Sequence, residues 1–169
     1  MDMAAYVQRV RTADRCFICA IVAGEPGFEH EVVFYDDGEH IAFLSRYPTV
    51  YGYALVSPKE HVEHIVRERD LDAYLRTQAV VHRVARAIEA VVEPERTYVA
   101  SLGSQQGNRH LHWHIVPLPP GTPYEAQQLE TMRTENGILD WSVERAEHLG
   151  ERLMRALASR SMRDADSLT

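Results

Sequence analysis

Short apolar runs separated by turn residues indicate a sheet in the first third of the chain. Residues 32–35 form one such run, residues 41–44 form another, and residues 36–38 between them read DDG. Aspartate followed by glycine between apolar runs is typical of a tight hairpin turn, so we expect two antiparallel strands. A third run at 53–56 ends at Ser57 and predicts a third strand.

Two segments have the periodicity of helices. From about residue 68 to residue 92 the apolar side chains recur every three or four positions, and Pro94 ends the pattern. A second helical pattern covers residues 138–157, within a polar C-terminal extension of about 124–158. We expect residues 159–169 to form a flexible tail.

Two more strands are expected in the second half of the chain, at 97–102 and 110–118, with the polar, glycine-containing loop 103–109 between them. Together these elements predict an α+β fold. It has an antiparallel sheet of about five strands, one long central helix and the C-terminal helical extension. We expect a single domain over residues 1–158, with its core at about 16–118.

The composition of the chain excludes some kinds of binding partner and favours others. The chain has 169 residues, of which 45% are hydrophobic and 25% charged, as is usual for a globular domain. The formal net charge of -7 argues against nucleic acid as a partner and favours a small molecule as the source of any bound phosphate. No apolar stretch approaches the ~20 residues that span a bilayer, and the first ten residues lack the apolar core of a secretory signal. We therefore expect a cytoplasmic protein without membrane association.

Three histidines alternate with apolar residues in the run HLHWHI, which begins at His110. On a strand, His110, His112 and His114 would share one face. Buried imidazoles each need partners for an N–H and a lone pair, so this pattern is poorly explained as core packing. It favours either a metal site or nucleophilic and acid–base chemistry. Side chains four apart on a strand are ~13 Å apart at Cα, so His110 and His114 cannot easily share one ion.

The two cysteines, Cys16 and Cys19, have the spacing of metal ligands. Two histidines would complete a tetrahedral zinc site, and the candidates are His61 and His110. His64 is a rival to His61, because the two would lie on one side of a helical turn. Without a metal, the cysteines could form a redox pair or remain two small buried thiols.

Three segments of the chain resemble the histidine-triad (HIT) superfamily. These are the opening CFICAIVAGEPG, the central AFLSRYPTVYGYALVSPKEHVEHI and the run HLHWHIVPL, which together cover roughly residues 16–118 in the order found in that family. The resemblance implies a HIT-like fold, a nucleotide substrate and a homodimer. Zinc-containing bacterial members use the CxxC, the histidine of PKxH and the first triad histidine, which implies Cys16, Cys19, His61 and His110 as the ligands here.

The resemblance also assigns the chemistry. The middle histidine is the family's nucleophile, so His112 would attack the α-phosphorus of a nucleotide, and water would then hydrolyse the nucleotidyl-imidazole. A neutral imidazole is a good nucleophile, and a covalent intermediate divides one difficult displacement into two easier ones. His114 would bind a phosphate oxygen and help to protonate the leaving group. The motif with Trp113 and the SRYP sequence favour diadenosine polyphosphate hydrolases over phosphoramidases, while phosphorylase and transferase reactions remain open.

Polar residues just before the triad are candidates to bind phosphate. Ser104, Gln105, Gln106 and Asn108 supply uncharged hydrogen-bond donors, and Gln106 is the first choice. The family usually has GQxVxH here, whereas this chain has QQGNRH, with Gly107 at a position that is often serine or threonine.

The nucleoside side of the expected site also departs from the family pattern. Ser45 stands where an aspartate or asparagine usually binds the ribose. Phe43, Leu44 and Ile21 are expected to form an apolar slot for the base. Tyr53 occupies a position where the family usually has a histidine, and the sequence suggests no catalytic role for it.

Two other functions compete with catalysis of this kind. A HIT protein that binds nucleotides with little turnover would explain Ser45, Tyr53 and the altered loop. A metal-dependent barrel enzyme could use HxHxH as ligands, but it would need many more strands and a carboxylate ligand, and it would lack a long helix in mid-chain.

Overall fold

The computed structural model describes residues 16–28, 31–68, 70–104 and 108–166. Its centre is a five-stranded antiparallel sheet with the strand order β1-β2-β3-β5-β4. The strands are β1 (Val33–Asp36), β2 (His40–Leu44), β3 (Ala54–Pro58), β4 (Arg96–Ala100) and β5 (Trp113–Leu118). The expected α+β fold with five antiparallel strands is confirmed.

The hairpin between β1 and β2 forms for the reason that the DDG sequence suggested. The carboxylate of Asp36 accepts a hydrogen bond from the amide of Gly38, and that of Asp37 accepts from the amides of Glu39 and His40. Gly38 has a φ of +91°, which a side chain would disfavour. These local bonds fix the register of the first two strands.

The long helix α4 (Leu71–Val92) begins slightly later than the periodicity predicted. Asp70 caps its first turn by accepting a hydrogen bond from the amide of Ala73, and Glu93 ends it in a left-handed conformation. Two short helices precede it, α2 (Phe17–Val22) and α3 (Ile65–Glu68).

The α-helix of the C-terminal extension begins later in the chain than expected. Three 3-10 segments, η1 (Tyr124–Ala126), η2 (Gln128–Met132) and η3 (Thr134–Asn136), are followed by α5 (Val143–Asp166). The pattern predicted a helix from residue 138, but Trp141 lies before α5, edge-on to Tyr51 at 6.1 Å and against the core. The helix continues past residue 158 to Asp166.

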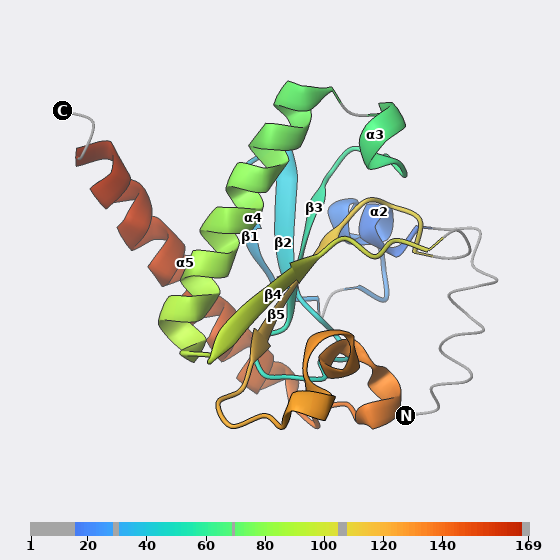
Figure 1. Ribbon diagram of the computed structural model, residues 1–169. Helices are drawn as coiled ribbons and strands as arrows, with labels where there is room; N and C mark the ends of the chain where they lie inside the picture. Colours follow the sequence, from blue (N-terminus) through green and yellow to red (C-terminus); the bar gives the residue numbers. More distant parts are fainter. Residues whose placement is uncertain (1–15, 29–30, 69, 105–107, 167–169) are drawn as a thin grey trace.

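Helices cover both faces of the sheet, as Figure 1 shows, with α4 and α5 on one side and α2 on the other. The larger core joins the sheet to α4 and to Leu149, Leu153 and Leu157 of α5. Gly150 allows this close packing, because a Cβ there would lie 2.5 Å from Val32 Cγ1. A smaller cluster on the α2 face includes Ile18 of that helix. Within the described residues, no helix is both long and apolar enough to cross a membrane.

Gly52 lies two residues before β3, and we expect its substitution to lower the stability of the fold measurably. Its φ is +86°, and an added Cβ would lie 2.8 Å from Val92 Cγ2 and 3.3 Å from Pro117 Cγ. We expect Gly52→Ala to lower the free energy of unfolding by roughly 2–4 kcal/mol, as measured by urea denaturation. Gly121 is the matched control, because its φ is +77° and nothing lies within 4 Å of the added Cβ. An equal loss in Gly121→Ala would show that backbone conformation alone sets the cost.

Candidate functional site

The three histidines lie on one side of a segment that only partly belongs to the sheet. His114 is in β5, whereas His110 and His112 precede Trp113, where the strand begins. Their apolar neighbours Leu111, Trp113 and Ile115 are buried in the larger core, so the expected alternation is confirmed. Among the described residues, the backbone just before β5 does not pair with a neighbouring strand. Instead, the Leu111 amide donates to the Val62 carbonyl at 2.7 Å, and the Ser101 hydroxyl donates to the His112 carbonyl at 2.9 Å.

His112 is oriented by the backbone of its own segment. Its Nδ1 lies 2.6 Å from the carbonyl oxygen of His110, and the ring is 1% exposed. A carbonyl only accepts hydrogen bonds, so Nδ1 must carry the hydrogen and Nε2 must carry the lone pair. Burial lowers the pKa of His112, which keeps the ring neutral at neutral pH. His112 therefore has the protonation state of a nucleophile at Nε2.

His114 is the neighbour of His112 on the α2 face of the sheet. The centroids of the two rings are 4.8 Å apart. On the neighbouring strand β3, His114 pairs with Leu55. Its Nδ1 lies 2.8 Å from the hydroxyl of Tyr53. Burial, reinforced by the nearby His112, lowers the pKa of His114 to about 3. Both rings are thus neutral at neutral pH.

Apolar and aromatic groups border this pair of histidines. The Phe17 ring is edge-on to His112 at 6.4 Å and to Phe43 at 6.3 Å. Phe43 and Ile21 belong to the cluster on the α2 face, but Leu44 belongs to the larger core on the opposite face. The expectation that Leu44 shares a slot with Phe43 was therefore wrong, because adjacent residues of a strand face opposite sides.

Ser45 and the loop before the triad were expected to bind the ribose and the phosphate, and the structure shows part of their backbone contacts. Ser45 is half-buried, and its amide donates to the Tyr53 carbonyl at 2.9 Å. The amide of Ser104 donates to the carbonyl of Asn108 at 3.1 Å, which closes the base of the loop. Gln106, the preferred phosphate ligand, lies with Gln105 outside the described residues.

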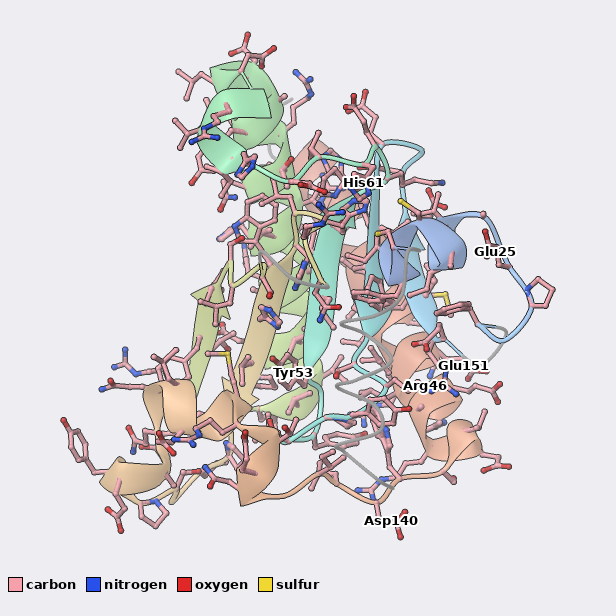
Figure 2. All side chains as sticks on the ribbon, turned by 90° about the vertical axis from the view of Figure 1, so that its right-hand side faces the viewer. Glu25, Arg46, Tyr53, His61, Asp140 and Glu151 are labelled. Atoms are coloured by element: carbon pink, nitrogen blue, oxygen red, sulfur yellow. The ribbon has the colours of Figure 1, made fainter. Side chains whose placement is uncertain are left out.

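A second cluster contains two cysteines and two histidines. The ligating atoms of Cys16, Cys19, His61 and His110 all lie within 4.8 Å of one another. The Cys16 Sγ–His110 Nδ1 distance is 3.3 Å, and Cys19 Sγ lies 3.2 Å from His61 Nδ1 and 3.5 Å from His110 Nδ1. Among the described residues, the cluster does not include His64, the rival to His61. Figure 2 shows His61 beside α2, the helix that carries Cys19.

The cluster fits a tetrahedral zinc ion. Ligand atoms of such an ion lie roughly 3.5 Å apart, close to the sulfur–nitrogen distances here. Both histidines direct Nδ1 at the thiols, because Nε2 of His110 donates to the Pro58 carbonyl at 2.9 Å and Nε2 of His61 donates to Glu63 at 3.2 Å. Burial lowers the pKa of His110 to about 4, so its ring is neutral, as a ligand must be.

The surroundings of Cys19 oppose ionisation of its thiol. Burial, together with neighbouring Cys16, raises the pKa of Cys19 to about 11. A bound cation would supply the charge that lets this thiol become a thiolate at neutral pH.

Two residues with clear contacts to these clusters were missed by sequence reasoning. Glu63 bonds His61 and also lies 3.3 Å from Arg109 Nε, and its place two residues after His61 was a usable signal. Phe17 contacts His112, but nothing in its spacing predicts that contact.

The sheet, the helix α4 and the three alternating histidines together define a histidine-triad protein. The model of the HIT domain family matches residues 28–120. Since this is more than half of the chain, the protein belongs to the HIT family, and the resemblance found in its sequence is confirmed.

Relatives and solved structures agree with this assignment. An uncharacterized HIT-like protein of Mycobacterium tuberculosis is 31% identical over 105 residues, covering 60% of this chain and 70% of that protein. The adenosine 5'-monophosphoramidase of Schizosaccharomyces pombe is 31% identical over 107 residues, covering 62% of this chain and 74% of the relative.

Among solved structures, a hypothetical histidine triad nucleotide-binding protein of Sulfolobus tokodaii is 26% identical, with a TM-score of 0.68 over 85% of this chain and 93% of the other. A zinc-bound histidine triad family protein of Mycobacterium smegmatis, at 24% identity, shares the fold, with a TM-score of 0.66 over 87% of this chain and 96% of the other.

Proposed function

We propose that the protein cleaves a nucleotide derivative at its α-phosphate through a covalent intermediate on His112. The observation that carries this proposal is the bond between His112 Nδ1 and the His110 carbonyl, which leaves Nε2 with a lone pair on a buried, neutral ring. A nucleophile held in one tautomer needs no rearrangement before it attacks.

The reaction proceeds in two displacements. His112 Nε2 attacks the α-phosphorus, a nitrogen–phosphorus bond forms, and the bond from phosphorus to the leaving group breaks with its electron pair going to the leaving group. Water then attacks the same phosphorus and loses a proton to the solvent, the nitrogen–phosphorus bond breaks with its electron pair returning to His112 Nε2, and a mononucleotide is released. Another acceptor in place of water would make the enzyme a phosphorylase or a transferase.

The substrate class includes nucleoside phosphoramidates and dinucleoside polyphosphates. The relative from Schizosaccharomyces pombe supports phosphoramidates, while Trp113 in the triad run and the SRYP sequence favour dinucleoside polyphosphates. Phe17 and Phe43 offer aromatic surface near His112 for the base, and Ser45 offers a hydroxyl for the ribose.

The test uses an amine phosphoramidate of adenosine monophosphate and diadenosine tetraphosphate as substrates. Rapid quenching in neutral denaturant should trap protein heavier by one adenylyl group, and peptide mapping should locate that group on His112. Saturable nucleotide binding with neither adduct nor released mononucleotide would instead identify a HIT protein that binds without turnover.

We propose that Cys16, Cys19, His61 and His110 hold a zinc ion with a structural role. The ligand spacing and the orientation of both histidines support this site. Zinc bound there would tie α2 to the segment that precedes β5, while His112 and His114 remain available for the reaction.

Glu63 predicts a quantitative effect on metal affinity. Its carboxylate accepts a hydrogen bond from His61 Nε2, which directs Nδ1 at the cluster. We expect Glu63→Gln to weaken zinc binding about 10- to 100-fold, as measured by competition with a chromophoric chelator. Glu147→Gln, an exposed change on α5, should leave the affinity unchanged. Unaltered affinity in Glu63→Gln would contradict the proposed role of this carboxylate.

We also propose a homodimer in the cytoplasm, where cysteine thiols stay reduced. The strand β4 ends the described sheet, and its Val99 is 46% exposed, with Leu102 beyond it 50% exposed. An unpaired strand edge with apolar side chains is a suitable surface for a second copy. Analytical ultracentrifugation should give twice the 19.3 kDa of the chain, and a monomer alone would refute the dimer.

A further inference from the structure

Tyr53, the residue that replaces a usual histidine of the family, contacts the second histidine of the proposed reaction. Its hydroxyl lies 2.8 Å from His114 Nδ1, and the two rings are edge-on at 5.8 Å. Tyr53 is 7% exposed. This contact joins the end of the loop before β3 to β5. Through it Tyr53 can determine which nitrogen of His114 carries the hydrogen.

The surroundings of Tyr53 hold its ring in place. It packs in a cluster with Val50 and Val116, and Met132 of η2 lies against this cluster. Figure 2 shows Tyr53 at the end of the sheet that lies nearest the 3-10 segments. The Thr49 hydroxyl donates to the Thr131 carbonyl and fastens η2 to the same loop. A side chain buried in this way can fix the hydrogen-bonding geometry of its partner.

The direction of the hydrogen bond follows from the groups involved. Burial raises the pKa of Tyr53 further above its ordinary value, so the phenol keeps its hydrogen at neutral pH. Among the described residues the hydroxyl forms no other hydrogen bond, so a reversed bond would leave the phenolic hydrogen without an acceptor in that part of the chain. The hydroxyl therefore donates to Nδ1 of His114, and the hydrogen of the neutral ring is on Nε2.

We propose that Tyr53 is a positioning residue that holds His114 with its hydrogen on Nε2, so that His114 donates a hydrogen bond to a non-bridging phosphoryl oxygen. This inference rests on the proposed function for its substrate. It gives the neighbouring rings complementary roles: His112 presents a lone pair at Nε2, and His114 presents an N–H.

In this arrangement His114 stabilises charge on the phosphoryl oxygen and does not give up its proton. A neutral imidazole that lost the Nε2 hydrogen would become an anion, which burial disfavours. The leaving group thus takes its proton from another source, such as water. Of the two roles that the family resemblance assigned to His114, the proposal keeps the binding of a phosphate oxygen and drops the protonation of the leaving group.

The first test measures the tautomer without substrate. In the full-length chain with ¹⁵N-labelled histidine, NMR should show His114 protonated at Nε2 and unprotonated at Nδ1. Tyr53→Phe should move the Nδ1 resonance, because the hydrogen bond to it is lost. Tyr98→Phe is the matched control: Tyr98 packs against the same cluster, and its hydroxyl lies 3.5 Å from Gln127 Oε1. A wild-type protein with the hydrogen on Nδ1 would overturn the proposal.

The second test measures the reaction. Tyr53→Phe should lower kcat about tenfold with little change in KM, and Tyr53→His, which restores an N–H donor, should recover most of the rate. Cleavage of an adenylyl phosphoramidate of an amine and of the adenylyl ester of p-nitrophenol should slow by the same factor. A much larger loss with the amine, the poorer leaving group, would show that His114 is a proton donor and would overturn the proposal.

The two tests separate this inference from the proposed function. If the wild-type protein releases no mononucleotide from either substrate and forms no adduct, the proposed function fails and with it the catalytic role of His114. The NMR measurement still decides whether Tyr53 fixes the His114 tautomer.

Discussion

His112→Ala is expected to reduce mononucleotide release by about 10⁴-fold or more, because it removes the atom that forms the covalent bond to phosphorus. The loss should appear in kcat, with substrate binding largely retained, since the ring of Phe17 and the rest of the site remain. Release of mononucleotide from an adenylyl phosphoramidate, followed by chromatography, measures this loss.

The control for this substitution is a histidine of the same chain outside the site. His82 is exposed on α4, and His82→Ala should have wild-type activity. Circular dichroism and thermal unfolding of both variants separate loss of chemistry from loss of structure. Comparable turnover in His112→Ala and the wild type would exclude His112 as the nucleophile.

Cys16→Ser is expected to remove most of the bound zinc and with it a large part of the stability that the ion supplies. The purified wild-type protein should contain one zinc ion per chain. If free zinc exceeds its dissociation constant about 1,000-fold, binding to the native state alone contributes about 4 kcal/mol to the free energy of unfolding. Elemental analysis, and urea denaturation with and without a chelator, measure the two quantities.

Cys16→Ser is a selective test, because Cys16 is also the N-cap of α2. Its Sγ accepts a hydrogen bond from the Cys19 amide at 3.4 Å, and a serine hydroxyl caps helices well. The cap is therefore kept while the thiolate ligand is lost. His64→Ala should retain zinc, since His64 lies outside the cluster. A Cys16→Ser, Cys19→Ser double variant that keeps both zinc and stability would refute the ligand set.

Sequence reasoning predicted the fold well where a local pattern determines the structure. The alternation from His110 to Ile115 separated buried apolar residues from histidines, and DDG at 36–38 specified a hairpin whose turn is closed by bonds from aspartate side chains to amides two or three residues away. The same alternation should have separated Phe43 from Leu44, which were wrongly expected to share a slot.

The remaining differences arise from tertiary contacts. The strand β5 begins at Trp113 and not at residue 110, because the preceding backbone bonds Val62 and Ser101, which are far away in sequence. The apolar Trp141 fits a helical period, yet it packs on Tyr51 before α5 begins.

The candidate site shows the same division between local and distant information. Residue type and spacing, read with the family resemblance, singled out the cysteines and histidines that the structure brings together in one cluster. The contact of Tyr53 with His114 joins residues 61 positions apart, and no spacing in the sequence predicts it.

The packing of α5 has a practical consequence for anyone who trims this protein. The family match ends at residue 120, but Leu149, Leu153 and Leu157 lie in the same hydrophobic core as the sheet, with Gly150 against Val32. We therefore expect the folding unit to include α5 and to be longer than the segment that the family model matches. Domain boundaries for expression, fusion or comparison of homologues need to keep α5, because a cut near residue 120 would divide one core.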